Sequence, residues 1–560
     1  MTKKLFAMLL AAVMLLGVLT ACNSSNNGDW ISYNEVLTQV VNGEDANETQ
    51  GEETVKTDEK GDVVKTNGNK TTTVSRRTKV SSTTKGGAVM TGMQTRTTRE
   101  GNKKIKYTLV EDKGADYKVK GNVSIAVDTT RPTDYEAMFD VMQEVYPNIN
   151  FTFDFHTDSS NGSYTAYLSK KIATKTAANI MWDSAENLPV VLGYGWVKPI
   201  TQYFKKDPEA KYVPANVTKD HTFYGDLYAL PHQATFGATY INTDLFGKLS
   251  LKMPDLDWDL ADYDAFYKKG AAGFSARNCV AVPFMFDTFI MEWAHYFAGA
   301  DGKHLSEDFY NWDTGKYDLT YATKAVKQMR EWRLIPGGEG WSMANTKSGG
   351  TNLLNQQLGV DSEHSVWWQG KALMSSGGTW SYPEMEERCN FKFEMWPTPN
   401  KNGNLQYHVD TCYVTSTTSD AQMPAVYQAL RFMTFSTNGN LARLQMYEKS
   451  EKGKYALNAR VYYPVSTNPT VLNKFNKLDV TTKADVYMLK NIPNSSRYDA
   501  FKLVPEINSI TDQYITNTLA QVQEGSKDPG DLADPIVKAN KALQTAKDEF
   551  KAQYNKAYKK

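Results

Sequence analysis

The stretch between Val123 and Trp182 restricts the fold most, because strand patterns and helix patterns alternate along it. Short apolar, β-branched runs are typical of buried parallel strands, and apolar residues three or four apart are typical of helices. A strand–helix–strand–helix–strand series predicts a parallel sheet with right-handed crossovers. The segments are the strands Val123–Val127, Asn148–Phe155 and Ala178–Trp182 and the helices Asp134–Tyr146 and Tyr164–Thr176.

The segment Phe223–Asn242 (FYGDLYALPHQATFGATYIN) is expected to leave this sheet and join a second one. It breaks at Pro231 and resumes as a strand at Thr235–Ile241, which is a common way to connect two α/β lobes. From Asp531 onward, apolar residues at helical spacing predict an amphipathic helix that packs on a lobe. The other expected elements are the helices Trp258–Lys269, Asp287–Phe297, Tyr321–Leu334 and Met423–Thr434, a helical stretch that leads into a loop within Gly439–Pro464, and the strands Val280–Phe284, Lys371–Met374, Phe391–Pro397 and His408–Ser416.

Four large aromatic residues surround a glycine pair, Gly377-Gly378, in Val366–Met385 (VWWQGKALMSSGGTWSYPEM). Glycines lack the Cβ bulk that keeps a backbone away from a ligand. Trp380 and Tyr382 would then lie on a loop at a strand end, where open α/β sheets bind ligands. Core packing is the better interpretation of any single tryptophan, but four aromatics around one break favour the wall of a binding site.

The N-terminus predicts export and lipid attachment. Met1–Lys4 is basic, and Leu5–Leu19 is an apolar run shorter than the roughly 20 residues of a membrane-spanning helix. The following Thr20-Ala21-Cys22 resembles the end of a bacterial lipobox, which implies cleavage before Cys22 and lipid on its thiol. Because two acyl chains hold a protein stably on a membrane, the mature chain is expected on the extracellular face of the bacterial cell membrane, lipid-anchored. An ordinary secretory signal with a chance cysteine is the alternative.

Composition separates a polar segment from the globular remainder. Residues 23–117 are rich in Ser, Thr, Asn and Lys and poor in aromatics, which predicts a mostly flexible stalk, with local structure at Trp30–Val41 and Ile105–Val110. The whole chain has 63 basic and 63 acidic residues, which argues against nucleic acid as a partner. Beyond Cys22 there are only three cysteines, too few for a disulfide framework, although one bridge is possible.

A cluster of acids at Asp255–Asp264 begins with the spacing of a calcium-binding loop. Leu260 takes the place of the required glycine, however, and no glutamate closes the loop. Acids at the start of a helix, interacting with its macrodipole, are the better interpretation. We therefore expect no metal site and no cofactor.

Several motifs, in their order and spacing from about Gly121 to the C-terminus, resemble the extracellular solute-binding proteins of bacterial ABC importers (family 1), which include maltose-binding proteins. They are the lipobox, NINFTFDF, ANIMWDSAENLPVVLGYGWVKPIT, YGDLYALPHQATFGATYINTDLF, WWQGKALMSSGGTW and FKFEMWPTPNKNG. The resemblance implies an α/β, two-lobed periplasmic-binding-protein-like (type II) fold, with hinge strands and a ligand cleft between the lobes. The expected layout is a signal peptide (1–22), a stalk (23–117), lobe 1 with the hinge (118–240 plus roughly 390–470), lobe 2 (241–389 plus roughly 410–530) and the C-terminal helix (531–560).

The resemblance also implies a mono- or oligosaccharide ligand, ABC permease subunits as membrane partners, and a monomer. Sugar rings lie against aromatic faces, and their hydroxyls need carboxylate or amide partners. By position in the family pattern, the expected ligand-binding residues are Trp182, Asp183, Glu186, Asn187, His232 (or its neighbour Gln233), Phe236, Asp287, Trp293, Trp380, Tyr382 and Asp410.

Two other functions stay open. A surface-attached glycoside hydrolase needs only two facing carboxylates, although no HExxH, GxSxG, Walker or CxxC motif is present. A glycan-capture lipoprotein without a transporter would use the same residues. Binding without catalysis is the interpretation that the pattern favours.

Overall fold

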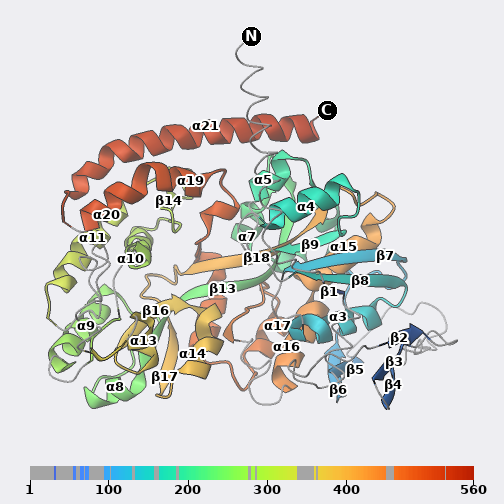
Figure 1. The fold of residues 1–560 in the computed structure, drawn as a ribbon, viewed down its shortest axis with the longest axis horizontal. Coiled ribbons are helices and arrows are strands. Elements are labelled where there is room, and N and C mark those ends of the chain that lie inside the picture. Colours follow the sequence, from blue (N-terminus) through green and yellow to red (C-terminus); the bar gives the residue numbers. More distant parts are fainter. Residues whose placement is uncertain are drawn as a thin grey trace, which may run out of the picture.

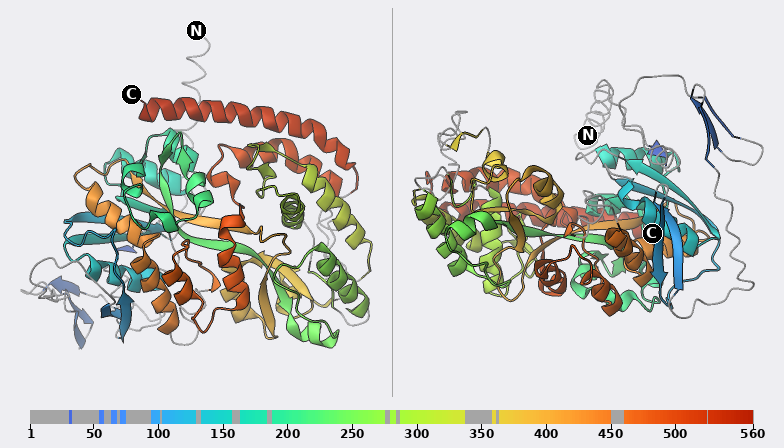
Figure 2. Two further views of the ribbon diagram at one scale, coloured as in Figure 1. Left: turned by 180° about the vertical axis from the view of Figure 1, so that it is seen from behind. Right: turned by 90° about the horizontal axis from the view of Figure 1, so that it is seen from below.

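The computed structural model describes residues 31–32, 54–57, 63–67, 70–74, 94–100, 103–128, 133–156, 163–183, 188–274, 279–283, 287–336, 358–360, 363–449, 460–523 and 525–559. They form two α/β lobes joined by long strands (Figure 1), and Figure 2 shows the same two lobes from behind and from below. The signal segment with Cys22 lies outside the described residues.

The predicted alternation of strands and helices is confirmed in lobe 1. Strand β7 (Gly121–Asp128) pairs in parallel with β8 (Ile149–His156) on one side and β9 (Ile180–Asp183) on the other. Helices α3 (Thr133–Val145) and α4 (Ser163–Ala173) connect them. The parallel sheet places the carboxyl ends of β7 and β9 together, next to the second lobe.

Helices from later in the chain complete lobe 1. α15 (Met423–Met433) buries an almost continuous apolar surface against β7, and α16 (Thr437–Lys449) packs against α3. α5 (Leu188–Gly193) covers a second, smaller core. The chain therefore leaves lobe 1 only after Ala229 and returns to it before its C-terminal segment.

Two strands connect the lobes. The first half of β13 (Ala229–Asn242) pairs with β18 (Gln406–Thr415), whereas its second half pairs with β16 (Met374–Gly378) and β17 (Phe393–Pro397) of lobe 2. β18 in turn pairs with β9 of lobe 1. The expected crossing strand is thus confirmed, but Pro231 does not break it: the register shifts by a bulge between Pro231 and Gln233, because proline lacks the N–H that the ladder needs.

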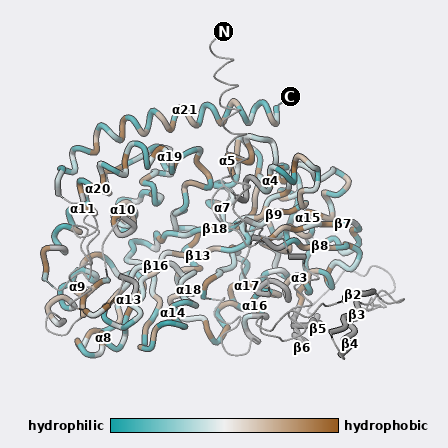
Figure 3. Tube along the Cα trace, in the orientation of Figure 1, coloured by the Kyte–Doolittle hydropathy of each residue, from teal (hydrophilic) through white to brown (hydrophobic). Residues whose placement is uncertain are grey.

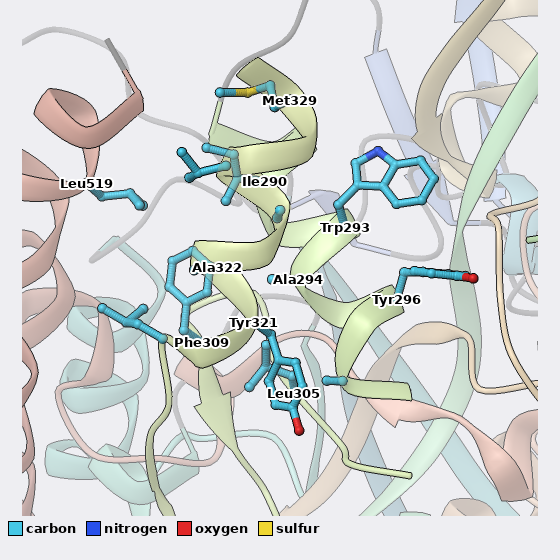
Figure 4. Packing of buried hydrophobic residues seen from close by; sticks show 14 of the residues in the cluster. Ile290, Trp293, Ala294, Tyr296, Leu305, Phe309, Tyr321, Ala322, Met329 and Leu519 are labelled. Carbon is cyan, nitrogen blue, oxygen red and sulfur yellow. The ribbon is translucent and has the colours of Figure 1, made fainter. Parts of the chain in front are cut away.

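Lobe 2 packs helices around an aromatic core. α10 (Asp287–Ala300) and α11 (Thr320–Arg333) lie against each other, with α9 (Leu260–Phe274) and α8 (Thr243–Lys248) beside them. Figure 4 shows apolar side chains of α10 and α11 packed with Phe309 and Leu519 in this core. Asp259 caps α9: its Oδ1 accepts from the backbone N–H of Ala261 at 2.8 Å and of Asp262 at 3.3 Å, so this acid starts a helix as expected.

Two predicted strands are wrong in detail. Residues 280–283, the described part of the expected strand, do not form one, since Val280 makes only an isolated bridge to Ala372. The expected strand Lys371–Met374 lies later, at β16, and the glycine pair belongs to it: Gly377 pairs with Ala238 of β13. A Cβ on Gly377 would lie 3.2 Å from the ring of Tyr240, so glycine allows close approach to a neighbouring strand rather than to a ligand at this position.

Shorter elements complete the two lobes. They are β10 (Val197–Lys198), α6 (Thr201–Phe204), η2 (Ala210–Tyr212), α7 (Ala215–Asp220), β11 (Thr222–Phe223), β12 (Asp226–Leu227), β14 (Tyr310–Asn311), β15 (Lys316–Tyr317), α13 (Glu363–Trp368), η4 (Thr379–Ser381), α14 (Tyr382–Arg388), α17 (Pro469–Phe475), α18 (Lys483–Lys490), η6 (Ile492–Asn494), β19 (Ser496–Arg497), η7 (Ala500–Lys502), α19 (Ile507–Thr511), η8 (Asp512–Thr516), α20 (Asn517–Gln523) and η9 (Pro529–Leu532).

The segment before Leu109, predicted as a mostly flexible stalk, contains strands. β2 (Thr54–Thr57), β3 (Val63–Asn67) and β4 (Lys70–Val74) form a three-stranded sheet, and β5 (Gln94–Glu100) pairs with β6 (Lys103–Leu109). Valine and threonine are frequent in these strands and favour extended backbone. The local structure predicted near Ile105 is confirmed as β6, and β1 (Ile31–Ser32) adds to the edge of β8.

The C-terminal helix α21 (Ala533–Tyr558) is confirmed, and it spans both lobes (Figure 1). Its N-terminal half buries Leu543 in the core of lobe 2, and its C-terminal half buries Tyr554 in the core of lobe 1. The hydroxyls of Tyr554 and Tyr228 lie 2.7 Å apart, and Asn540 Oδ1 accepts from the backbone N–H of Tyr317 at 2.8 Å. Hydrophobic and hydrophilic positions alternate along the helix in Figure 3, as its single buried face requires.

A buried arginine holds the first residues of the globular part to lobe 1. Arg431 on α15 contacts Asp112 and Asp207, each at 2.7 Å, and Glu209 at 3.0 Å. All four side chains are almost completely removed from water. A guanidinium with fixed donors can satisfy several carboxylates at once, so this cluster fastens Asp112 and its neighbours to the core.

Candidate functional site

The candidate site lies where β13 and β18 pass between the lobes. Alternate residues of a strand face the same side, which places His408, Asp410 and Cys412 on one face of β18. Asp410 is opposite Gln233 of β13, and Cys412 is opposite Trp182 of β9. The four-residue step from His408 to Cys412 corresponds to about 13 Å of strand.

Asp410 is held by two polar neighbours and keeps some contact with solvent. Gln233 Nε2 donates to Asp410 Oδ2 at 2.8 Å, and Lys502 Nζ lies 3.6 Å from Oδ1. The side chain is 17% exposed. Burial raises the pKa of the Asp410 carboxyl, while the charge of Lys502 and the bond from Gln233 act in the opposite direction.

A buried ion cluster supports Asp410 from the segment after β19. Asp499 contacts Arg497 Nε at 2.5 Å and Lys502 Nζ at 2.8 Å. Burial alone would raise the pKa of the Asp499 carboxyl, but the two cations outweigh it and hold the pKa well below its usual range. Asp499 therefore stays ionised and fixes Lys502 beside Asp410.

Trp380 provides the exposed aromatic surface of the site. It follows β16 on η4, is 48% exposed, and meets the His408 ring edge-on, with ring centroids 4.8 Å apart. On its other side His408 packs on Tyr498 at 4.5 Å. Burial lowers the pKa of His408 to about 4, so its imidazole is neutral at pH 7 and serves as a rigid support for the indole.

Trp182 and His232 lie at the other end of the same strand face. Both are buried, and their ring centroids are 4.7 Å apart. His232 sits at the bulge of β13, where its backbone carbonyl accepts from Arg443 Nη1 at 2.9 Å. Burial lowers the pKa of His232 well below its usual range. Trp182 and Trp380 thus border one stretch of β18 from opposite ends.

Besides Trp182 and His232, three further predicted contact residues are buried in the cores. Phe236 is fully buried and meets Tyr463 edge to face, and Trp293 is buried among the lobe 2 aromatics (Figure 4). Tyr382 is buried and accepts from Arg460 Nη1 at 2.5 Å. Their burial argues against direct ligand contact, since an aromatic pattern alone does not distinguish core from cleft.

The remaining predicted residues are only partly placed. Asp183 ends β9 opposite Thr411, and Asp287 begins α10, but their side chains lie outside the described part of the chain, as do Glu186 and Asn187 altogether. Their roles as ligand contacts stay predictions.

The site also contains residues that were not predicted from the sequence. His408 was predictable from the sequence, because it precedes Asp410 by two residues in an expected strand and so shares its face. Lys502 and Asp499 lie about ninety residues later, and no sequence pattern links them to Asp410. Glu292 of α10 is a further one: its carboxyl hydrogen-bonds Ser376 of β16, four residues before Trp380. Burial raises the pKa of Glu292 to about 8.

The raised pKa of Glu292 predicts a pH-dependent loss of stability in the ligand-free protein. A carboxyl whose folded pKa exceeds its unfolded value binds more protons when folded, so its contribution is full below the unfolded pKa of about 4.3 and is lost as the pH rises through about 8. In Glu292→Gln, the free energy of unfolding measured in urea should therefore depend less on pH between pH 5 and 9 than it does in the wild type. Glu307 and Asp308 also have raised pKa values and contribute to the pH dependence of both proteins. The quantity to compare is therefore the difference in unfolding free energy between variant and wild type at each pH. A difference that stays constant with pH would contradict the raised pKa of Glu292.

Membrane-spanning helices, metal-ligand clusters and disulfides are the other features that would bear on function. There, no helix is both apolar enough and long enough to cross a bilayer, and no three His, Cys, Asp or Glu side chains gather as metal ligands would. Among the described residues, Cys279, Cys389 and Cys412 form no disulfide, so the one bridge that the cysteine count allowed does not form.

Two α/β lobes, joined by crossing strands that carry polar and aromatic side chains, define a two-lobed solute-binding protein. Residues 137–448 match the family model described as "Bacterial extracellular solute-binding protein", and the chain belongs to this family. The family is one of binding proteins rather than enzymes, and its members act outside the cytoplasm. A search of curated protein sequences gave no match.

Solved structures support the same fold. The ABC substrate-binding protein from Listeria monocytogenes in complex with cycloalternan matches with a TM-score of 0.52 and 15% identity over 78% of this chain and 99% of that one. A sugar transporter protein from Rhizobium etli in an open conformation gives 0.54 and 16%, over 76% and 99%. The GacH receptor of Streptomyces glaucescens, solved with acarbose, gives 0.51 and 13%, over 77% and 100%. At such identities these likenesses establish the two-lobed fold.

Proposed function

We propose that this protein is a lipid-anchored extracellular receptor that captures an oligosaccharide and delivers it to an ABC transporter permease. Closure of two lobes around the ligand is the mechanism that the fold supports. Binding, without a chemical step, is the activity.

The observation that carries the proposal is the half-exposed ring of Trp380 near the partly exposed Asp410 and the buried Gln233 that is bonded to it. A pyranose presents C–H faces to an aromatic ring and hydroxyls at its rim. Asp410 and Gln233 offer acceptors for such hydroxyls on the strands next to Trp380. Solved structures of the same fold in complex with cycloalternan and with acarbose support a carbohydrate ligand.

Anchoring and delivery rest on other grounds. The basic start, the short apolar run and Cys22 support attachment of the mature chain to the membrane by lipid. A transporter partner is supported by two proteins of the same fold, an ABC substrate-binding protein and a sugar transporter. An anchored receptor keeps captured ligand close to a membrane permease.

The test follows tryptophan fluorescence and product formation together, using the mature protein with a panel of neutral oligosaccharides. Binding should give a saturable fluorescence change because Trp380 is half-exposed and would be covered by ligand. Chromatography of the same mixtures should recover the sugar uncleaved. Cleavage would favour the surface glycoside hydrolase, and no saturable change with any sugar would reject the carbohydrate proposal.

A further inference from the structure

The two cations nearest Asp410 have no accessible donor for a ligand. Lys502 Nζ contacts Asp499 Oδ2 at 2.8 Å and Asp410 Oδ1 at 3.6 Å, and it lies 3.3 Å from the carbonyl oxygen of Val409. Of the three N–H donors of this ammonium, two lie at hydrogen-bond distance from Asp499 and Val409, and the longer contact with Asp410 is an ion pair. The Lys502 side chain is only 9% exposed.

Arg497 is engaged in the same way. Its Nε donates to Asp499, its Nη1 lies 2.9 Å from His221 Nε2, and its Nη2 donates to the carbonyl of Val409 at 3.3 Å. It is almost completely buried. Neither positive group is therefore placed to receive a carboxylate or phosphate from a ligand beside Trp380.

Acceptor oxygens, in contrast, remain available. Gln233 is 1% exposed, and its Oε1 has no hydrogen-bond partner among the described residues, although its Nε2 is bonded to Asp410. A buried polar atom without a partner costs free energy unless a ligand or water satisfies it. Oε1 of Gln233 thus lacks a donor, and Oδ1 of the neighbouring Asp410 has only its long ionic contact with Lys502, so both oxygens can accept from a ligand hydroxyl.

The electrostatic balance of the site follows from these contacts. Arg497 and Lys502 are offset by Asp499 and Asp410, and the member of the four with the most solvent contact is the carboxylate of Asp410. An anionic group brought beside it would meet a like charge, and like-charge juxtaposition in an interface costs several kcal/mol. A hydroxyl would instead donate to it.

We propose that the site selects neutral sugars over acidic ones, with Asp410 and Gln233 accepting hydroxyl hydrogens from the ring stacked on Trp380. The inference rests on the proposed carbohydrate function and names the ligand class within it. Uronic-acid-containing and phosphorylated sugars are rejected because Asp410 repels them and both nearby cations are already paired. Lys502 acts by fixing Asp410 and does not bind anions.

The test compares each neutral trisaccharide with its derivative oxidised to a carboxylate at C6, using maltotriose, cellotriose and mannotriose as probes and titration calorimetry on the mature protein. For any trisaccharide that binds, the neutral form should bind at least tenfold more tightly than the oxidised form. In Asp410→Asn, the ratio of the two affinities should fall toward one, whatever the loss in absolute affinity.

Asp420→Asn is the matched control. Asp420 is an exposed carboxylate paired with Lys198 on lobe 1, so its removal changes the net charge equally and should leave the ratio as in wild type. Equal or tighter binding of the oxidised form by wild type would overturn the inference and leave the carbohydrate function standing. A ratio unchanged in Asp410→Asn would assign selection to other residues. Failure of every neutral and oxidised probe to bind would reject both proposals.

Discussion

Replacing Trp380 by alanine is expected to weaken oligosaccharide binding by about 1–3 kcal/mol, the range measured for stacking of planar bases on aromatic side chains, or roughly 5- to 150-fold in Kd. The indole is 48% exposed and is supported edge-on by His408. Because its orientation is already fixed, little side-chain entropy is lost when a ligand stacks on it. Because the side chain is only half-buried, the melting temperature should fall much less than for a core tryptophan. Calorimetric titration and thermal unfolding of the variant measure the two effects.

Trp368→Ala is the matched control for this experiment. Trp368 is also a partly exposed tryptophan of lobe 2, but it packs against Arg388, 4.3 Å from its ring centroid, and not on the crossing strands. Its loss should leave the affinity unchanged. If Trp380→Ala kept full affinity and instead lowered the melting temperature, Trp380 would be a packing residue and the stacking surface would have to be found elsewhere.

The largest effect on stability is expected from Arg431→Met. Methionine fills similar space but leaves the carboxylates of Asp112, Asp207 and Glu209 buried together without a cation, and breaking a buried ion pair in this way costs about 3–5 kcal/mol. Urea unfolding at pH 7 measures the loss. Limited proteolysis should also show earlier cleavage near Asp112, since that segment is fastened to α15 through this arginine.

Arg388→Met provides the comparison. Its ion pair with Glu384 is half-exposed on both sides, and pairs of this kind contribute under about 1 kcal/mol. If Arg431→Met lost no more unfolding free energy than Arg388→Met, the buried carboxyls would have become protonated at no cost. That result would contradict the stabilising role assigned to the Arg431 cluster.

The architecture was predictable because its signals are local. In β7, α3 and β8, hydrophobic spacing alone distinguishes strand from helix, and the observed bounds differ from the expected ones by only a few residues. The glycine pair of β16 shows the limit of such signals. A glycine that admits a ligand and a glycine that admits the ring of Tyr240 have the same sequence pattern, and only the neighbouring strand decides between them.

The site was less predictable for a related reason. Trp293 and Trp380 both stand in aromatic segments, yet one fills the core of lobe 2 and the other remains half-exposed, a difference set by what packs on each. The partners of Asp410 come from β13 and from η7, which the chain reaches about ninety residues later. Spacing within one segment carries no information about such a contact.

The helix α21 has a consequence for motion. This single helix of 26 residues is hydrogen-bonded to Tyr317 near one end and to Tyr228 near the other, and these two residues belong to different lobes. Any rotation of one lobe against the other must therefore break the contacts at one end of the helix, shift the helix along a lobe or bend it. The C-terminal helix therefore resists rotation of one lobe against the other.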